Sequence, residues 1–229
     1  MKDDVSVIIP AYNEAAVITA TLNSLNSLPH IKEIVVVDDG SNDGTAEKAK
    51  AAGAQVIVQP FNKGKGAALT RGLQESLGEY ICFLDADLGE SAACAAKLYQ
   101  PIKVGNADIA IAAFPPAKSK GGFGVVTNLA RFGLRSFTGK EFQSPLSGQR
   151  AMSRGAAERL APFADGFGVE VSFTIDAYRA GFRVIEIPVE MFHRETGRDW
   201  RGFYHRGRQC CHVARVFLEK ARDRGRGFD

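Results

Sequence analysis

Two carboxylates one residue apart, Asp85 and Asp87, directly follow the apolar run at residues 80–84. Burying an unpaired charge is costly, so we expect these acids at the carboxyl-terminal end of a strand, facing a ligand. In an open α/β sheet, ligands bind at that edge. Two carboxylates held there without a cationic neighbour favour a divalent ion, Mg²⁺ or Mn²⁺, with hard oxygen ligands. The alternative is a solvated loop that carries two acids by chance.

A second pair of acids, Asp38 and Asp39, follows the apolar run at residues 34–37. Taken alone, acids before Gly-Ser-Asn-Asp are typical of a helix-capping turn. Their position after a buried strand, however, predicts that they share the sheet edge with Asp85 and Asp87. A carboxylate there can accept hydrogen bonds from a base N–H or from ribose hydroxyls.

A basic glycine turn, Gly64-Lys65-Gly66, stands at the predicted start of a helix. Backbone N–H groups at a helix start can approach phosphate oxygens, aided by the helix dipole and by Lys65. The turn matches neither a Walker A loop nor a Rossmann dinucleotide fingerprint. Together, the three groups predict a nucleoside diphosphate ligand held with a divalent ion.

The elements that position these groups alternate between strand and helix from residue 5 to residue 112. This alternation predicts an α/β fold, with a mostly parallel, doubly wound sheet and helices on both faces, in a single domain. Asn13 is the expected N-cap of the first helix. We expect strands at residues 5–10, 34–37, 54–58, 80–84 and 108–112. The helices should run from residue 13 to about 28, from residues 43–45 onward, from residue 66 to about 77, and from residue 91 to about 104.

The second half of the chain is less regular. Residues 114–124 form a loop with Lys118 and Lys120, which is either a mobile lid or only a surface connection. Beyond it we expect helices at residues 125–137, 156–160, 169–180 and 202–222, and strands at residues 147–152 and 182–189. The predicted division is a catalytic domain at residues 1–201 and a basic helix and tail at residues 202–229.

Composition narrows the class of protein. The 229-residue chain has no apolar run near the roughly 20 residues that span a bilayer. Its first residues lead straight into a strand and its four cysteines show no paired spacing, so we expect no secretory signal and a cytoplasmic location. The segment from Arg194 onward contains ten basic and five acidic residues, although the net charge of the whole chain is only +3. This basic end suggests phosphate-bearing ligands or the inner face of an anionic membrane, or only a solvated helix.

The motifs at residues 7–14, 37–45, 62–66 and 85–88 occur in the order seen in GT-A fold nucleotide-sugar glycosyltransferases. The chain resembles the large inverting family that includes dolichyl- and polyprenyl-phosphate sugar transferases. It is also similar to glucosyl-3-phosphoglycerate synthases. The shared motifs span residues 5 to about 200, and they are specific for the fold and the donor class but much less so for the acceptor.

The resemblance implies a role for each matching residue. The nucleoside pocket would be lined by the segment after the first strand, and the base or ribose would be held by the acids after the second. Lys65 would lie near the diphosphate, and Asp87, with Asp85 beside it, would hold a Mg²⁺ or Mn²⁺ ion that bridges the two phosphates. The residues implied in binding the nucleotide sugar are Pro10, Ala11, Tyr12, Glu14, Asp38, Asp39, Lys65, Asp85 and Ala86.

Residues 147–151, Ser-Gly-Gln-Arg-Ala, resemble the S-G-F-R-A stretch of the polyprenyl-phosphate enzymes. Glu170 aligns with an acid that faces the reacting centre and that would act as general base in an inverting enzyme. The alternative is a glutamate that only satisfies the first turn of a helix. If the attacking oxygen belongs to a phosphate it is already ionised, and Glu170 would then only position groups.

One departure from the polyprenyl pattern bears on the metal. That family usually has Asp-Ala-Asp-Leu-Gln-His, where the Gln helps bind the metal, whereas this chain has Gly89 and Glu90. The resemblance therefore points to His193 as the further metal ligand, although a lone histidine after a strand is often structural. Arg194 and Arg198, in the basic segment that follows, would fold over the donor diphosphate.

The sequence thus predicts a metal-dependent glycosyltransferase that uses a nucleotide sugar, UDP-linked in preference to GDP-linked. The acceptor would be a polyprenyl phosphate, a small phosphorylated molecule or another hydroxyl compound. The alternatives are a nucleotidyltransferase that makes nucleotide sugars and a non-catalytic nucleotide-sugar-binding subunit. The last helix would either touch an anionic membrane or pack on the domain. The sequence is compatible with a homodimer. No feature supports nucleic-acid binding.

Overall fold

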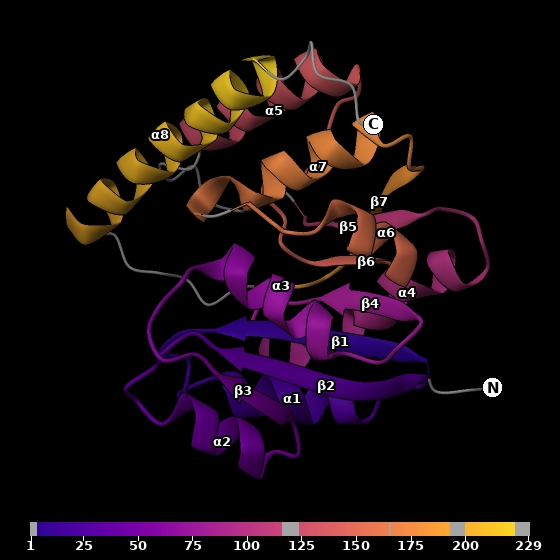
Figure 1. Cartoon of the computed structure of the whole chain (residues 1–229), viewed down its shortest axis with the longest axis vertical. Coiled ribbons are helices and arrows are strands. Elements are labelled where there is room, and N and C mark those ends of the chain that lie inside the picture. The colour runs from indigo at the N-terminus through magenta and orange to yellow at the C-terminus, as the bar shows by residue number, and fades with distance from the viewer. Residues whose placement is uncertain (1–3, 116–123, 165, 193–199, 223–229) are drawn as a thin grey trace.

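The computed structural model describes residues 4–115, 124–164, 166–192 and 200–222, and within them the strands form one seven-stranded sheet (Figure 1). The strand order is β3-β2-β1-β4-β6-β5-β7. The strands are β1 (Val5–Ala11), β2 (Ile31–Asp38), β3 (Gln55–Val58), β4 (Tyr80–Phe83), β5 (Ile109–Ala113), β6 (Arg150–Ser153) and β7 (Val184–Pro188).

The sheet is mostly parallel, as the alternation of strands and helices predicts. β1 to β4 pair in parallel, and β7 pairs in parallel with β5. β6 runs antiparallel to both of its neighbours, β4 and β5. This reversal brings the start of β6 to the carboxyl end of β4, since Phe83 is paired with Arg150.

Helices cover both faces of the sheet. They are α1 (Ile18–Asn26), α2 (Thr45–Ala51), α3 (Lys65–Glu75), η1 (Gly89–Ala95), α4 (Ala96–Lys103), α5 (Gly124–Thr138), α6 (Arg154–Leu160), η2 (Gly166–Gly168), α7 (Val169–Arg179) and α8 (Trp200–Arg222). Successive side chains of a strand point to opposite faces, so Val7 and Ile9 join the core under α1 and α4. Ile8 joins the second core, under α3, α5 and α7. The doubly wound architecture is therefore confirmed.

The strand expected at residues 147–152 is shorter, at Arg150–Ser153, and two further local predictions differ from the structure. Asn13 does not cap α1, which begins only at Ile18. Its backbone is left-handed, with φ of 58°, and its side-chain Oδ1 accepts a hydrogen bond from the Asn42 N–H at 3.0 Å, so Asn13 joins two loops instead. The helix expected at residues 91–104 is divided into the 3₁₀ segment η1 and the helix α4.

The described part of α8 packs on the domain. Val213 is fully buried and Val216 nearly so, and α8 contacts both α5 and α7. Figure 1 shows these three helices gathered at one end of the molecule. The Phe217 ring stacks on Phe137 with centroids 5.8 Å apart, and Lys220 forms an ion pair with Asp176. Among the described helices, none combines the length and the apolar character that crossing a bilayer requires.

Gly66 meets a packing requirement that the sequence does not reveal. A Cβ atom at this position in α3 would lie 2.1 Å from the carbonyl oxygen of Ala164 and 2.8 Å from that of Phe163. Backbone atoms cannot rotate out of the way, so only glycine lets the start of α3 approach residues 163–164 this closely. The position of the neighbouring Lys65 therefore depends on this contact.

Candidate active site

The predicted chemical groups meet at one edge of the sheet. Because β1, β2 and β4 run in parallel, their carboxyl ends and the loops that follow them lie at the same edge. α3 begins there with Lys65, and the antiparallel β6 brings residues 147–149 to the end of β4. Glu170, in the first turn of α7, completes the group.

Lys65 joins two of the predicted acids. Its Nζ lies 2.7 Å from Asp85 Oδ1 and 3.0 Å from Glu170 Oε1. Burial by itself lowers the pKa of Lys65, but the two carboxylates outweigh it and raise that pKa above its ordinary value. Lys65 therefore stays an ammonium ion. The expectation that Asp85 has no cationic neighbour is wrong, because the chain folds its own lysine against this acid.

Residues 147–149 make room for this ion pair and extend it. A Cβ atom at Gly148 would lie 2.4 Å from Lys65 Nζ, so a side chain there would displace the ammonium group. Gln149 is fully buried, and its Nε2 donates a hydrogen bond to Asp85 Oδ2 at 2.6 Å. The sequence marks Gly148 and Gln149 only as members of a stretch that resembles the polyprenyl-phosphate enzymes. The one signal in it is a glutamine in place of the phenylalanine of that stretch.

Arg150 ties the same loop to the start of α7. This buried guanidinium donates from Nε to the Ser147 carbonyl at 3.1 Å and from Nη2 to the Glu170 carbonyl at 2.8 Å. It also lies over the ring of Phe173, 4.6 Å from its centroid. Burial lowers the pKa of Arg150 to about 10, against the opposing effect of Glu170, so the group is still charged at neutral pH. Arg150 therefore fixes the backbone that carries Glu170.

Asp39 organises the turn that leads into α3. Its Oδ1 accepts hydrogen bonds from Gln59 Nε2 and the Lys63 N–H, and its Oδ2 accepts one from the Gly64 N–H, each at 2.8 Å. Asp38 is also buried, and its Oδ1 accepts a hydrogen bond from the Ser41 N–H at 2.8 Å. Both acids thus shape loops at the sheet edge, and their contact with a base or ribose stays a prediction.

The remaining residues predicted to line the nucleotide pocket lie along the same edge. Pro10 and Ala11 end β1, and Tyr12, in the loop beyond them, is 47% exposed. The backbone N–H of Glu14 donates to Thr45 Oγ1 at 2.9 Å, which joins this loop to the start of α2. An exposed aromatic ring next to two buried acids is a suitable place for a nucleoside base to stack.

Thr21, in α1, holds the loop that carries Asp85 and Asp87. Its hydroxyl donates to the Ala86 carbonyl at 2.7 Å and accepts from the Gly89 N–H at 2.8 Å. Asp85 and Asp87 are carboxylates of the kind that Mg²⁺ and Mn²⁺ prefer, and both oxygens of Asp85 already accept hydrogen bonds, from Lys65 and from Gln149. The described residues contain no group of three or more His, Cys, Asp or Glu side chains arranged to hold a metal. His193, Arg194 and Arg198 lie outside the described residues, so their roles stay predictions.

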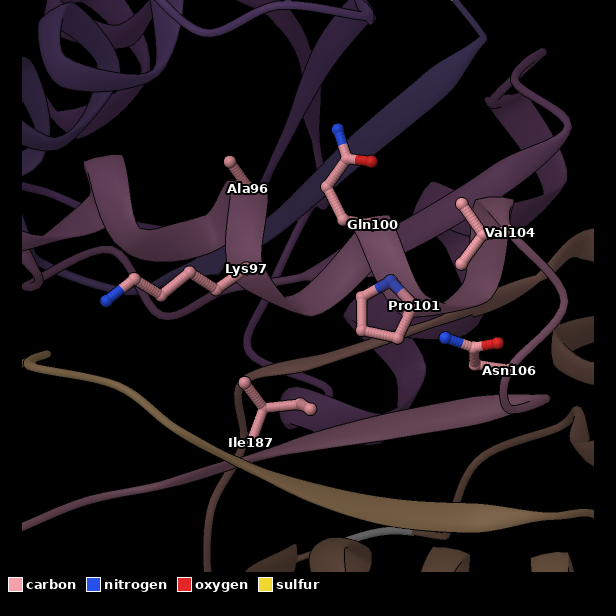
Figure 2. A pocket seen from close by; sticks show the side chains of 7 residues that line it. All are labelled: Ala96, Lys97, Gln100, Pro101, Val104, Asn106 and Ile187. Carbon is pink, nitrogen blue, oxygen red and sulfur yellow. The ribbon is translucent and has the colours of Figure 1, made fainter.

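A hollow elsewhere on the molecule lacks such chemistry. Figure 2 shows it between α4 and β7, and Lys97 is its only charged lining residue within the described structure. The residues that line it are Ala96, Lys97, Gln100, Pro101, Val104, Asn106 and Ile187. The acid cluster at the carboxyl edge of the sheet is therefore the better candidate active site.

Comparison with known sequences shows which family the chain resembles. A sequence model of the family described as glycosyl transferase family 2 matches residues 6–161. Glycosyltransferase AglJ of Haloferax volcanii is 30% identical over 205 residues, which cover 86% of this chain and 66% of AglJ. Glucosyl-3-phosphoglycerate synthase of Mycobacterium tuberculosis is 33% identical over 204 residues, covering 76% of this chain and 60% of the synthase. The chain thus spans slightly less than two thirds of these curated relatives.

Solved structures of the same synthase share the fold. A crystal structure of the M. tuberculosis enzyme in complex with phosphoglyceric acid matches with a TM-score of 0.80 and 29% identity, over 95% of this chain and 79% of that one. Another, in complex with Mn²⁺, uridine diphosphate and glucosyl-3-phosphoglycerate, matches with a TM-score of 0.79 and 28% identity, over 95% of this chain and 79% of that chain.

The ion pairs of Lys65 give a stability prediction. Lys65→Met leaves Asp85 and Glu170 close together without their shared cation, and we expect a loss on the order of 2 kcal/mol in the free energy of unfolding. This is less than for a fully buried pair because 28% of the Lys65 side chain is exposed.

The pH dependence of that loss follows from the raised pKa. The stabilisation by Lys65 is fully present below its unfolded-state pKa of about 10.5 and is lost as pH rises through the higher folded-state value. Urea unfolding of wild type and Lys65→Met should therefore differ by a constant amount from pH 7 to 9 and by less at more alkaline pH. Lys140→Met, at an exposed lysine, is the control and should change stability by less than about 0.5 kcal/mol. A difference that grows with pH would contradict the ion-pair assignment.

Proposed function

Since the chain belongs to glycosyl transferase family 2, we propose that it is a metal-dependent glycosyltransferase. It transfers a sugar from a UDP-sugar to a hydroxyl group of a phosphate-bearing acceptor. The observation that carries this proposal is the Lys65 ammonium between Asp85 and Glu170, with Asp87 two residues along, at the carboxyl edge of the parallel strands. The arrangement combines a diphosphate-binding group with a carboxylate suited to act as a base.

The donor assignment rests on the loops around the acid pair. Tyr12 offers an exposed ring for the base, and Asp38 and Asp39 lie at the end of the next strand for the base or ribose. The related synthase has been crystallised with uridine diphosphate and either Mn²⁺ or Mg²⁺. We therefore favour UDP over GDP, with Asp87 and Asp85 holding Mg²⁺ or Mn²⁺ and His193 as the further ligand.

In the transfer step, the bond between the anomeric carbon and the diphosphate oxygen breaks, and its electron pair leaves with the nucleoside diphosphate. A bound divalent ion would offset the charge that grows on that leaving group. Lys65 would add a fixed positive charge on the same side, and Arg194 and Arg198 would fold over the diphosphate. Glu170 would take the proton from the acceptor hydroxyl as its oxygen bonds to the anomeric carbon.

The position of Glu170 favours a hydroxyl as the attacking group. Glu170 Oε1 lies 3.0 Å from Lys65 Nζ, so a carboxylate that can take a proton stands beside the lysine proposed to bind the diphosphate. A neutral hydroxyl needs such a base, whereas an ionised phosphate does not. The phosphate of the acceptor would then bind away from the acids, which is consistent with the phosphoglyceric acid bound by the related synthase.

Two assembly proposals accompany this function. Residues 200–222 contain six arginines and lysines and one acid, a composition that suits the headgroups of an anionic membrane. The second assembly proposal is that two copies of the chain form a homodimer. Vesicle co-sedimentation with and without the residues after Gly202 tests the membrane contact, and light scattering tests the dimer.

Donor binding should appear as a rise in thermal stability. With Mn²⁺ present, a UDP-sugar at about one hundred times its Kd should stabilise the fold by about 2.7 kcal/mol, because only the folded state binds it. A thermal-shift screen of UDP- and GDP-sugars with Mn²⁺ or Mg²⁺ measures this shift. A melting temperature that no donor changes, with either metal present, would refute the proposed function.

Glu170→Gln tests the base. The substitution keeps the shape of the side chain but removes its capacity to take a proton, so kcat should fall by at least about 100-fold with little change in KM for the donor. Release of nucleoside diphosphate gives the rate, and Glu79→Gln is the matched control, in the turn before β4. A loss of less than tenfold would show that no strong base is needed and would favour a phosphate oxygen as the attacking group.

A further inference from the structure

Gln149 differs from the motif that its surroundings resemble. The polyprenyl-type stretch has phenylalanine at this place, whereas this chain has a side-chain amide. Gln149 is fully buried, and its Nε2 lies 2.6 Å from Asp85 Oδ2.

The contacts of Gln149 hold Asp85 in one orientation. Lys65 binds Asp85 Oδ1 at 2.7 Å while Gln149 binds Oδ2, so the carboxylate cannot rotate without losing both contacts. The amide is itself oriented by Ser147, whose Oγ donates to Gln149 Oε1 at 3.2 Å. The Gln149 backbone is fixed as well, because its carbonyl accepts a hydrogen bond from the Ala112 N–H of β5 at 2.9 Å.

We propose that Gln149 is a positioning residue that sets the orientation of Asp85 for binding a divalent ion together with a nucleoside diphosphate. This inference rests on the proposed function. Carboxylates that bind metals are usually held by hydrogen bonds from outer groups, and loss of such a group typically weakens metal binding about 10- to 100-fold. Gln149 directly precedes β6 and its backbone is hydrogen-bonded to β5, so these two strands would help to position the acids that follow β4.

The test is a double-mutant cycle read out by metal affinity. Mn²⁺ binding is measured by calorimetry with saturating UDP for wild type, Gln149→Leu, Asp85→Ala and the double variant. Gln149→Leu should weaken Mn²⁺ binding about 10- to 100-fold in the wild-type background but less than about twofold in the Asp85→Ala background. A residue that acts only on the packing of the loop would weaken binding equally in both.

Two further variants keep the test decisive. Ser147→Ala removes the hydroxyl that orients the amide with little change in packing, and it should weaken Mn²⁺ binding at least about threefold even if Gln149→Leu does not fold. Gln100→Leu removes an exposed amide of α4, labelled in Figure 2, and should leave the affinity unchanged.

The outcomes separate this inference from the proposed function. Unchanged Mn²⁺ affinity in Gln149→Leu or Ser147→Ala, or equal losses in both backgrounds, would overturn the role of Gln149 and leave the glycosyltransferase proposal intact. Wild type that binds no Mn²⁺ in the presence of UDP would overturn both.

Discussion

The ammonium group of Lys65, between Asp85 and Glu170, is the interaction on which the site depends. Removing three charged groups from water costs several kcal/mol for each ion, and only short, well-directed contacts recover that cost. The distances of 2.7 and 3.0 Å meet this condition. The same contacts join the start of α3, the end of β4 and the start of α7, so the charges can face each other only when the whole domain is folded.

Several neighbouring features serve to place these three groups. Asp39 holds the turn before α3 through the N–H groups of Lys63 and Gly64. Gly66 lets α3 approach residues 163–164, and Gly148 leaves space for the lysine ammonium. Arg150 connects the loop beside Asp85 to the backbone of Glu170. The glycines and buried charges around the site thus have a common purpose, which is to position one cation between two acids.

The sequence predicts the parts of this site that follow from local pattern. Apolar strands followed by acids indicate the parallel sheet and the edge at which Asp38, Asp39, Asp85 and Asp87 lie. The pairing of Lys65 with Glu170, 105 residues away, depends on how α7 packs on the sheet, and no local pattern contains that information. The phosphate-binding turn at Gly64-Lys65-Gly66 stays a prediction, whereas the close contact of Gly66 with the Ala164 carbonyl is visible only in the folded structure. The N-cap assigned to Asn13 was wrong because a tertiary contact with residue 42 gives it a left-handed backbone.

The most direct test is to locate the metal and nucleotide in crystals grown with Mn²⁺ and UDP, using the anomalous scattering of manganese. The account predicts one manganese peak within direct coordination distance of the Asp87 carboxylate, with the diphosphate bound next to it beside Lys65. Manganese and UDP at another place, such as the hollow between α4 and β7, with the acid pair unchanged, would contradict it.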